Sequence, residues 1–261
     1  MLSILRAIQR TGRVTTGYPD RPNPTDDAGC RGRPVVDPAL CDGAGDCARA
    51  CPTEAISLAP AASGANGWRL DLARCLFCGL CAEACARGAI RMSESSTLAA
   101  RTRAELVVEA GPNPPAPLRR GEKGETAPFG RLRRSLHIRH MAAGSENACD
   151  WEISALLNPV YDVQRLGIDF VASPRHADLL LVTGAVTRNL EPALLATYEA
   201  MPAPRIVVAV GDEACSGGIL RGSYACAGGV DRVLPVDVYV PGDPPRPQAL
   251  IEGLLIAAGK L

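Results

Sequence analysis

Cys75-Leu-Phe-Cys78-Gly-Leu-Cys81-Ala-Glu-Ala-Cys85 holds four of the eleven cysteines of this 261-residue chain, in a C-x2-C-x2-C-x3-C spacing. The spacing is typical of bacterial iron–sulfur sites, in which three closely spaced thiolates bind one cluster and the fourth binds a second cluster. Disulfide pairing is a poor alternative, because thiols this close in sequence pair badly with one another. The run therefore predicts a protein that transfers electrons.

A second cysteine run lies 34 residues upstream and repeats most of the first. The aligned pairs are Cys41 with Cys75, Cys47 with Cys81, Cys51 with Cys85 and Ile56 with Ile90. Two copies of one half-module predict a small α+β ferredoxin domain that binds two clusters.

The two predicted clusters differ in their number of thiolate ligands. By the crossed arrangement, one [4Fe–4S] cluster is expected to bind Cys51, Cys75, Cys78 and Cys81. The second cluster has three thiolates, which are Cys41, Cys47 and Cys85. The position that aligns with Cys78 is Ala44, and a methyl group cannot bind iron. We therefore expect a [3Fe–4S] cluster there, or a [4Fe–4S] cluster with water, Asp42 or Asp46 at its open corner.

Composition excludes several classes of protein. The formal net charge is zero, which argues against nucleic acid as a partner. No apolar run reaches the roughly 18 residues of a transmembrane helix, and the basic stretch 1–10 lacks the cleavage site of a signal peptide. Because cluster thiolates must stay reduced, we expect a reducing cytoplasm or the cytoplasmic face of a membrane.

Proline and glycine divide the chain into four parts. We predict an extended arm over 1–36, the ferredoxin domain over 37–92, a Pro/Gly/Arg-rich linker over 93–134 and a second domain over 135–261. The linker prediction rests on prolines such as those of 111–117, which remove amide donors from any helix or sheet. Cys30, in the arm, is as readily an incidental thiol as a ligand.

The last part alternates apolar strands with helices. Strands are predicted over 168–172, 178–184, 205–211 and 233–240, and helices over 190–200 and 248–258. This alternation predicts an α/β domain with a mostly parallel, flavodoxin-like sheet covered on both faces. Function in such sheets gathers beyond the carboxyl ends of the strands, here in 183–185, 211–218 and 241–246.

Several motifs in this domain resemble one known family. They are His137-Ile-Arg-His140, Gly144-Ser-Glu-Asn-Ala-Cys-Asp150, Gly211-Asp-Glu-Ala-Cys-Ser-Gly-Gly218 and Val236-Asp-Val-Tyr-Val-Pro-Gly-Asp-Pro-Pro-Arg-Pro247. In order and content they resemble the small subunit of membrane-bound group 4 [NiFe] hydrogenases, including formate hydrogenlyase, and the 20 kDa subunit of respiratory complex I. The resemblance covers nearly all of 135–261.

The resemblance implies a [4Fe–4S] cluster site that this chain has largely lost. Its four ligand positions correspond to Glu146, Cys149, Glu213 and Asp243, and one of them is a cysteine. Thiolates are soft ligands that suit iron–sulfur clusters, whereas carboxylates suit harder cations. A cluster in this domain is therefore not expected. We rank a cluster-free pocket first, a mononuclear metal second, and third a rearranged cluster that uses Cys215 and Cys226 beside Cys149.

The resemblance also implies a function. We expect an iron–sulfur electron-transfer subunit of a membrane-associated, hydrogenase-like or complex I-like oxidoreductase, with no complete active site of its own. Its expected partners are a hydrogenase large-subunit or complex I 49 kDa-like protein and membrane-arm subunits, with the chain peripheral on the cytoplasmic face. The alternative is a scaffold subunit in which the ferredoxin domain alone is redox-active.

Overall fold

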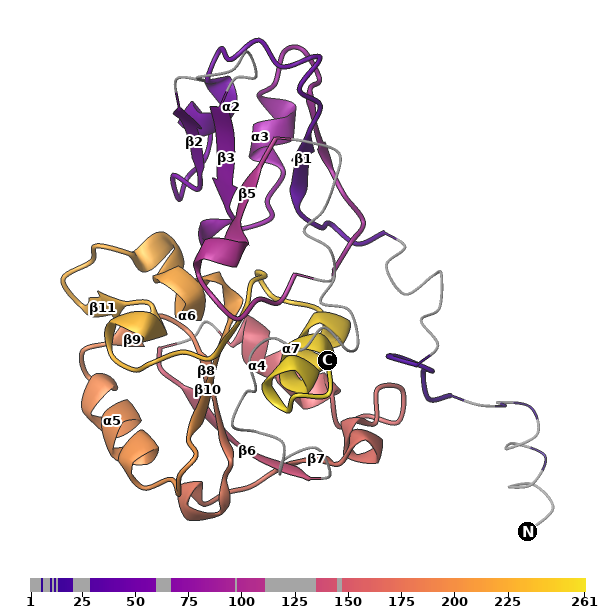
Figure 1. Ribbon diagram of the computed structural model, residues 1–261, viewed down its shortest axis with the longest axis vertical. Helices are drawn as coiled ribbons and strands as arrows, with labels where there is room; N and C mark the ends of the chain where they lie inside the picture. The colour runs from indigo at the N-terminus through magenta and orange to yellow at the C-terminus, as the bar shows by residue number, and fades with distance from the viewer. Residues whose placement is uncertain are drawn as a thin grey trace.

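A five-stranded parallel sheet forms the centre of the C-terminal domain (Figure 1). Its strands are β6 (Leu136–Ala142), β7 (Ile168–Phe170), β8 (Leu179–Thr183), β10 (Ile206–Val210) and β12 (Val238–Val240). Their order, β12-β10-β8-β6-β7, is the flavodoxin-like order read from its far edge, as the sequence predicted. The computed structural model describes residues 14–20, 29–59, 67–96, 98–110, 135–144 and 147–261, with the single positions 6, 10 and 12.

Alternating side chains of the buried strands build two cores, one on each face of the sheet. Leu179, Leu181 and Val208 face α4 (Ala148–Ala155) and α7 (Pro247–Ala257). Leu180 and Val207 face the other core, to which α5 (Glu191–Glu199) and α6 (Gly211–Ser216) contribute. Every residue of β8 and β10 is buried, as expected of parallel strands covered on both faces.

The ferredoxin domain is built from two small antiparallel sheets and two short helices. Its elements are β1 (Pro34–Val36), α2 (Asp46–Arg49), β2 (Ile56–Ala59), β3 (Gly67–Asp71), α3 (Leu80–Glu83), β4 (Ile90–Met92) and β5 (Val107–Glu109). β1 pairs with β4, and β3 pairs with both β2 and β5. The predicted α+β domain is therefore present, although all of β1 lies inside the range predicted as the arm and β5 lies inside the predicted linker.

Most predicted elements of the second domain are observed with shorter bounds. β6 and α4 were not predicted, and α6 lies in a stretch that was predicted as a loop, 211–218. β6 carries polar residues at His137, Arg139 and His140, which hide the apolar pattern of a buried strand, and its second half is only half-buried. The small two-stranded sheet of β9 (Val186–Thr187) and β11 (Cys226–Gly228) was also missed, because its strands are too short to show a period. Across the described ranges, no helix is long and apolar enough to cross a membrane.

Residues 98–110 join the two domains firmly rather than loosely. Ala100 and Tyr239 exchange two backbone hydrogen bonds of 2.9 and 2.8 Å, which adds this segment to the edge of β12. Arg103 makes a two-pronged contact with Asp71 of the ferredoxin domain, at 3.0 and 2.8 Å. Its Nε also lies 3.9 Å from Asp231 of the C-terminal domain. The proline-rich part of the predicted linker begins only at 111, outside the described residues. Its proline content therefore gave no information about the structure of 98–110.

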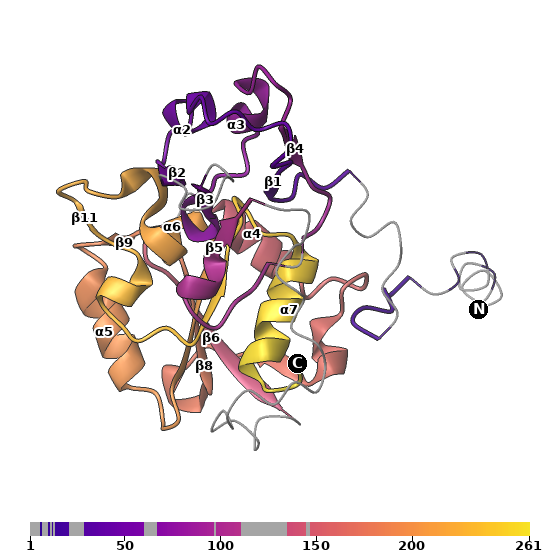
Figure 2. The same cartoon turned by 45° about the horizontal axis from the view of Figure 1, so that its top comes forward.

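Figures 1 and 2 show the result: the ferredoxin elements lie at one end of the molecule, above α6 and the carboxyl ends of the parallel strands. A second ion pair supports this placement, since Arg221 Nη2 lies 3.2 Å from Glu54 Oε2. The ferredoxin domain therefore sits over the edge of the sheet at which function was expected.

Replacing Arg103 with glutamine is expected to lower the free energy of unfolding by about 1–3 kcal/mol, the usual loss for a hydrogen bond to a charged group. The Arg103 and Asp71 side chains are mostly buried, so the remaining carboxylate would lie without its cation. Urea denaturation would measure the change. The matched control is Arg69→Gln, because the exposed Arg69–Glu109 pair should contribute less than about 1 kcal/mol. Equal losses in both variants would contradict the joining role of Arg103.

Candidate functional site

Four cysteines from the two runs line one small pocket in the ferredoxin domain. They are Cys51, Cys75, Cys78 and Cys81, which is the crossed set expected from the spacing. The remaining wall is mainly apolar, with Pro34, Ile56, Leu70 and Leu80 among its residues. The eleven cysteines, all of which lie in the described ranges, form no disulfide bond. The donor set of this pocket suits an iron–sulfur cluster, because it offers four soft thiolates in an apolar enclosure.

Thiolates in this four-cysteine pocket would be stabilised by a positively charged ligand. Burial raises the pKa of the Cys75 thiol to about 12 and that of Cys81 to about 11, and the neighbouring thiolates add to both shifts. Four thiolates together would therefore repel one another without positive charge between them. Iron supplies that charge when a cluster is bound.

Backbone amides point at two of the sulfurs. Phe77 N donates to Cys75 Sγ at 3.4 Å, and Ala55 N donates to Cys51 Sγ at 3.2 Å. Phe77 reaches this position with a left-handed φ of 52°, which residues with a β-carbon seldom adopt. Amide hydrogen bonds to sulfur are one of the factors that set the reduction potential of a bound cluster.

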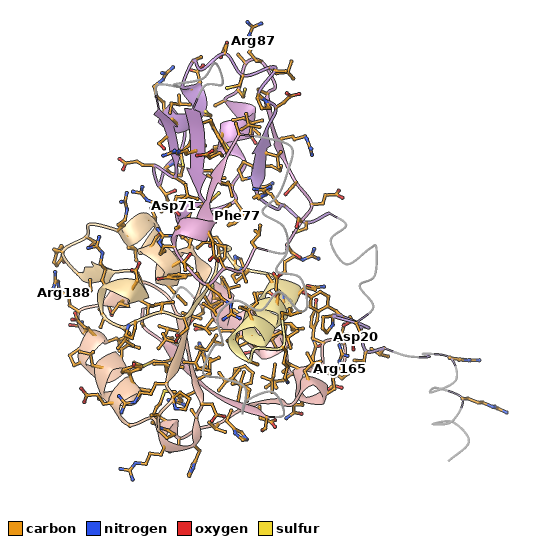
Figure 3. All side chains as sticks on the ribbon, in the orientation of Figure 1. Asp20, Asp71, Phe77, Arg87, Arg165 and Arg188 are labelled. Atoms are coloured by element: carbon orange, nitrogen blue, oxygen red, sulfur yellow. The ribbon has the colours of Figure 1, made fainter. Side chains whose placement is uncertain are left out.

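The second cysteine set lines a separate pocket at the outer end of the ferredoxin domain. Cys41, Cys47 and Cys85 lie there with Ala44 between them. Arg87, labelled at the far end of the molecule in Figure 3, is part of the same pocket, whereas Phe77 lies near the junction of the two domains. The two pockets thus lie at different distances from the C-terminal domain.

Both carboxylates considered as a fourth ligand line this three-cysteine pocket, and each also has a partner in the ferredoxin domain. Asp42 accepts hydrogen bonds from Ala44 N at 3.1 Å and from Arg87 Nε at 3.2 Å, and these contacts lower its pKa. Asp46 forms an ion pair with Arg49. Both carboxylates therefore have arginine partners within the ferredoxin domain, and the ligand at the corner beside Ala44 stays a prediction.

The C-terminal site lies at the carboxyl edge of the parallel sheet. Cys149 stands in the first turn of α4, Glu213 in α6, and Asp243 in the loop after β12. A β-carbon added to Gly211 would lie 2.6 Å from Cys149 Sγ, so only glycine lets α6 begin against this thiol. Burial, followed by the negative charges of Asp212 and Asp243, raises the pKa of Cys149. Glu146, the remaining predicted position, lies outside the described residues.

The structure separates the cysteines that a rearranged cluster would need. Cys226 lies on β11, opposite Thr187 of β9, whereas Cys149 lies in α4. Cys215 is fully buried and donates to Ala209 O at 3.6 Å, in the core on the opposite face of the sheet from Cys149. Among the described residues, no three His, Cys, Asp or Glu side chains converge closely enough for one metal ion. The cluster-free pocket, the mononuclear metal and the rearranged cluster all stay predictions.

A hydrogen-bonded group beneath this site was missed by the sequence reasoning. Thr183 Oγ1 donates to Asp150 Oδ1 at 2.6 Å, and His140 Nε2 lies 3.1 Å from Thr183 Oγ1 and 3.2 Å from Asp150 Oδ1. The group connects β6, β8 and α4 where the strand order reverses. Burial lowers the pKa of His140, so a structural role for its neutral ring fits the environment. The available signal was the place of Asp150 directly after Cys149.

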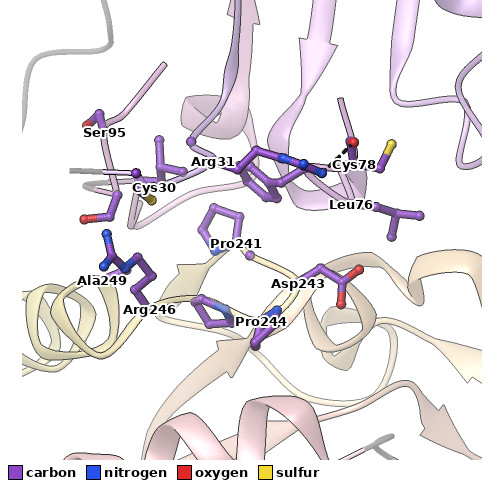
Figure 4. A pocket seen from close by; sticks show the side chains of 17 residues that line it. Cys30, Arg31, Leu76, Cys78, Ser95, Pro241, Asp243, Pro244, Arg246 and Ala249 are labelled. Carbon is purple, nitrogen blue, oxygen red and sulfur yellow. Dashed lines mark hydrogen bonds between the residues drawn. The ribbon is translucent and has the colours of Figure 1, made fainter. Parts of the chain in front are cut away.

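A cavity of about 440 Å³ separates the four-cysteine pocket from the C-terminal site (Figure 4). Cys78 and Phe77 line it from the ferredoxin side, and Asp243 and Arg246 line it from the loop after β12. Because Cys78 belongs to both spaces, the four-cysteine pocket is the one that faces the second domain.

These features define an iron–sulfur protein in which a small ferredoxin-like domain is joined to a flavodoxin-like α/β domain. Residues 147–257 match the family model of the NADH ubiquinone oxidoreductase 20 kDa subunit, and residues 40–89 match that of the 4Fe-4S dicluster domain. With these matches and the relatives described next, the chain belongs to the 20 kDa subunit family of NADH ubiquinone oxidoreductase.

The relatives come from hydrogenases and from NADH-quinone oxidoreductases. Formate hydrogenlyase subunit 7 of Escherichia coli is 44% identical over 131 residues, which are 50% of this chain and 51% of that protein. The probable membrane-bound hydrogenase subunit mbhJ of Pyrococcus furiosus is 46% identical over 128 residues, 49% of this chain and 77% of its own length. An NADH-quinone oxidoreductase subunit of Desulfovibrio desulfuricans is 50% identical over 107 residues, 41% of this chain and 58% of that one.

The chain thus spans about half the length of formate hydrogenlyase subunit 7. A chain in the solved structure of the membrane-bound sulfane sulfur reductase, an archaeal respiratory membrane complex, is similar to this one. The match covers 49% of this chain and 71% of the chain in that structure. The match has 35% sequence identity and a TM-score of 0.45.

Proposed function

We propose that this chain transfers electrons between the outer end of its ferredoxin domain and a partner at the C-terminal domain, within a membrane-associated hydrogenase-like or complex I-like complex. The observation that carries the proposal is the shared place of Cys78, which lines both the four-cysteine pocket and the cavity beside Asp243. Electrons delivered to the four-cysteine pocket would therefore leave next to the second domain. When bound, the clusters supply one-electron redox chemistry, and the protein supplies their position and surroundings.

We assign a [4Fe–4S] cluster to the four-cysteine pocket and a [3Fe–4S] cluster to the three-cysteine pocket. The second assignment is supported by Asp42 and Asp46, whose carboxylates are engaged by Arg87 and Arg49. The test is iron and acid-labile sulfide per chain on the anaerobically purified whole chain, with EPR spectra before and after dithionite. About seven irons are expected, and less than one iron per chain would overturn the function.

Replacing Cys149 with serine is expected to leave the iron content unchanged. Three of the four positions that correspond to ligands are not cysteine, and Cys149 lies among carboxylates that do not favour an iron–sulfur cluster. Iron analysis and EPR of the variant beside the unchanged chain would measure this. A loss of about four irons would show instead that the C-terminal domain binds a cluster.

Partner and location follow from the relatives and remain part of the proposal. We assign a hydrogenase large-subunit or complex I 49 kDa-like partner, together with membrane-arm subunits, on the cytoplasmic face of the membrane. Trp151, 76% exposed in α4 two residues after Cys149, offers an apolar contact for such a partner beside the C-terminal site. The formal net charge of zero argues against nucleic acid as a partner.

The second candidate is a scaffold role for the C-terminal domain, with electron transfer confined to the ferredoxin domain. The carboxylates of Glu213 and Asp243 at former ligand positions favour it. Rapid mixing of the prereduced whole complex with its oxidant would separate the two. Reoxidation of the chain's clusters at the rate of turnover supports electron transfer, whereas clusters that stay reduced through turnover support the scaffold.

A further inference from the structure

An arginine contacts the backbone carbonyl at the same position of both halves of the ferredoxin domain. Arg31 Nη1 donates to Cys78 O at 2.9 Å, and Arg49 Nη1 donates to Ala44 O at 3.3 Å. Ala44 and Cys78 are equivalent positions of the internal repeat. Arg49 belongs to α2, within its own half-module, whereas Arg31 reaches the four-cysteine pocket from the segment before β1.

The segment that carries Arg31 is held in place by its neighbours. Gly32 N donates to Ser93 O at 2.8 Å, and Ser93 N donates to Arg33 O at 2.9 Å. A β-carbon on Gly32 would lie 2.4 Å from Ser95 O, so the backbone here approaches the 93–95 segment as closely as glycine allows. Arg31 is thus presented to Cys78 by a fixed backbone, although its side chain is exposed.

The positive charge of Arg31 lies beside the pocket in which a cluster would accept an electron. Reduction adds one electron to a bound cluster and makes it more negative, so a nearby guanidinium stabilises the reduced state more than the oxidised state. Figure 4 shows Arg31 extending toward Cys78 along the cavity that both residues line. We propose that the positive charge of Arg31, held beside Cys78, raises the reduction potential of the cluster in the four-cysteine pocket. The inference rests on the proposed electron-transfer function.

An EPR-monitored redox titration of the whole chain tests this inference. In Arg31→Gln, at the midpoint potential of the unchanged chain, the ratio of reduced to oxidised four-cysteine cluster should fall about fivefold, as expected for loss of one partly exposed charge. This equals a shift of about 40 mV to lower potential, at 59 mV for each tenfold change. Arg31→Lys, which keeps the charge, should recover most of the shift. Arg49→Gln is the matched control and should leave this cluster unchanged.

The outcomes are distinguishable from failure of the function itself. An unchanged potential in Arg31→Gln, or an equal shift in Arg31→Lys, overturns a role for the charge. Loss of the cluster in Arg31→Gln also overturns the inference, because Arg31 would then serve assembly of the site. An unchanged chain without iron would overturn the proposed function, whatever the variants show.

Discussion

The Cys78→Ser variant is expected to lose about one iron per chain, because three thiolates would remain as in the three-cysteine pocket, together with the EPR signal that appears on dithionite reduction. Cys78 is one of four thiolates around a single apolar pocket, and it lies where that pocket meets the cavity between the domains. A serine alkoxide is a harder ligand than a thiolate and is poorly suited to a low-potential cluster. Iron and sulfide analysis with EPR on anaerobically purified protein would measure the loss.

Cys30 provides a matched control for this variant. Its thiol lines the same cavity as Cys78 but is not part of the four-cysteine pocket. Cys30→Ser should therefore keep all of its iron. If Cys30→Ser lost iron while Cys78→Ser kept all of its iron, the crossed ligand set would be wrong at this position.

The Ala44→Cys variant is expected to gain about one iron per chain, since a fourth thiolate would complete the three-cysteine pocket. The local backbone already has the shape of a ligand loop. Gly43 and Gly45 have φ angles of 75° and 81°, and the equivalent Phe77 and Gly79, which flank Cys78, have 52° and 86°. Ala44 is exposed, so a larger side chain meets no packed core.

EPR distinguishes the two cluster types in this second variant. A [3Fe–4S] cluster is paramagnetic when oxidised, whereas a [4Fe–4S] cluster of the ferredoxin type is paramagnetic when reduced. The signal of the oxidised protein should therefore disappear in Ala44→Cys and a second signal should appear after dithionite. Ala44→Val, which adds bulk without a ligand, should keep the original spectrum. Identical spectra for both variants would mean that position 44 does not face the open corner.

Local sequence patterns predicted much of the fold. Continuous apolar runs predicted β8 and β10 because parallel strands covered on both faces have no polar side to display. The same reasoning missed β6, where His137 and His140 serve contacts to Asp178 and Asp150 that only the folded chain brings near. It also treated 98–110 as linker, because the partners of Ala100 and Arg103 lie far away in sequence.

The cysteine spacing by itself determined the class of protein and predicted the two ligand sets and the missing ligand at Ala44, because cluster ligation is a short-range pattern repeated within the chain. Tertiary structure decided that the four-cysteine pocket faces the second domain, that Asp42 and Asp46 have the arginine partners Arg87 and Arg49, and that Arg31 reaches Cys78. These outcomes depend on contacts between distant segments, such as Arg103 with Asp71, and such contacts leave no periodic or local mark in a single sequence.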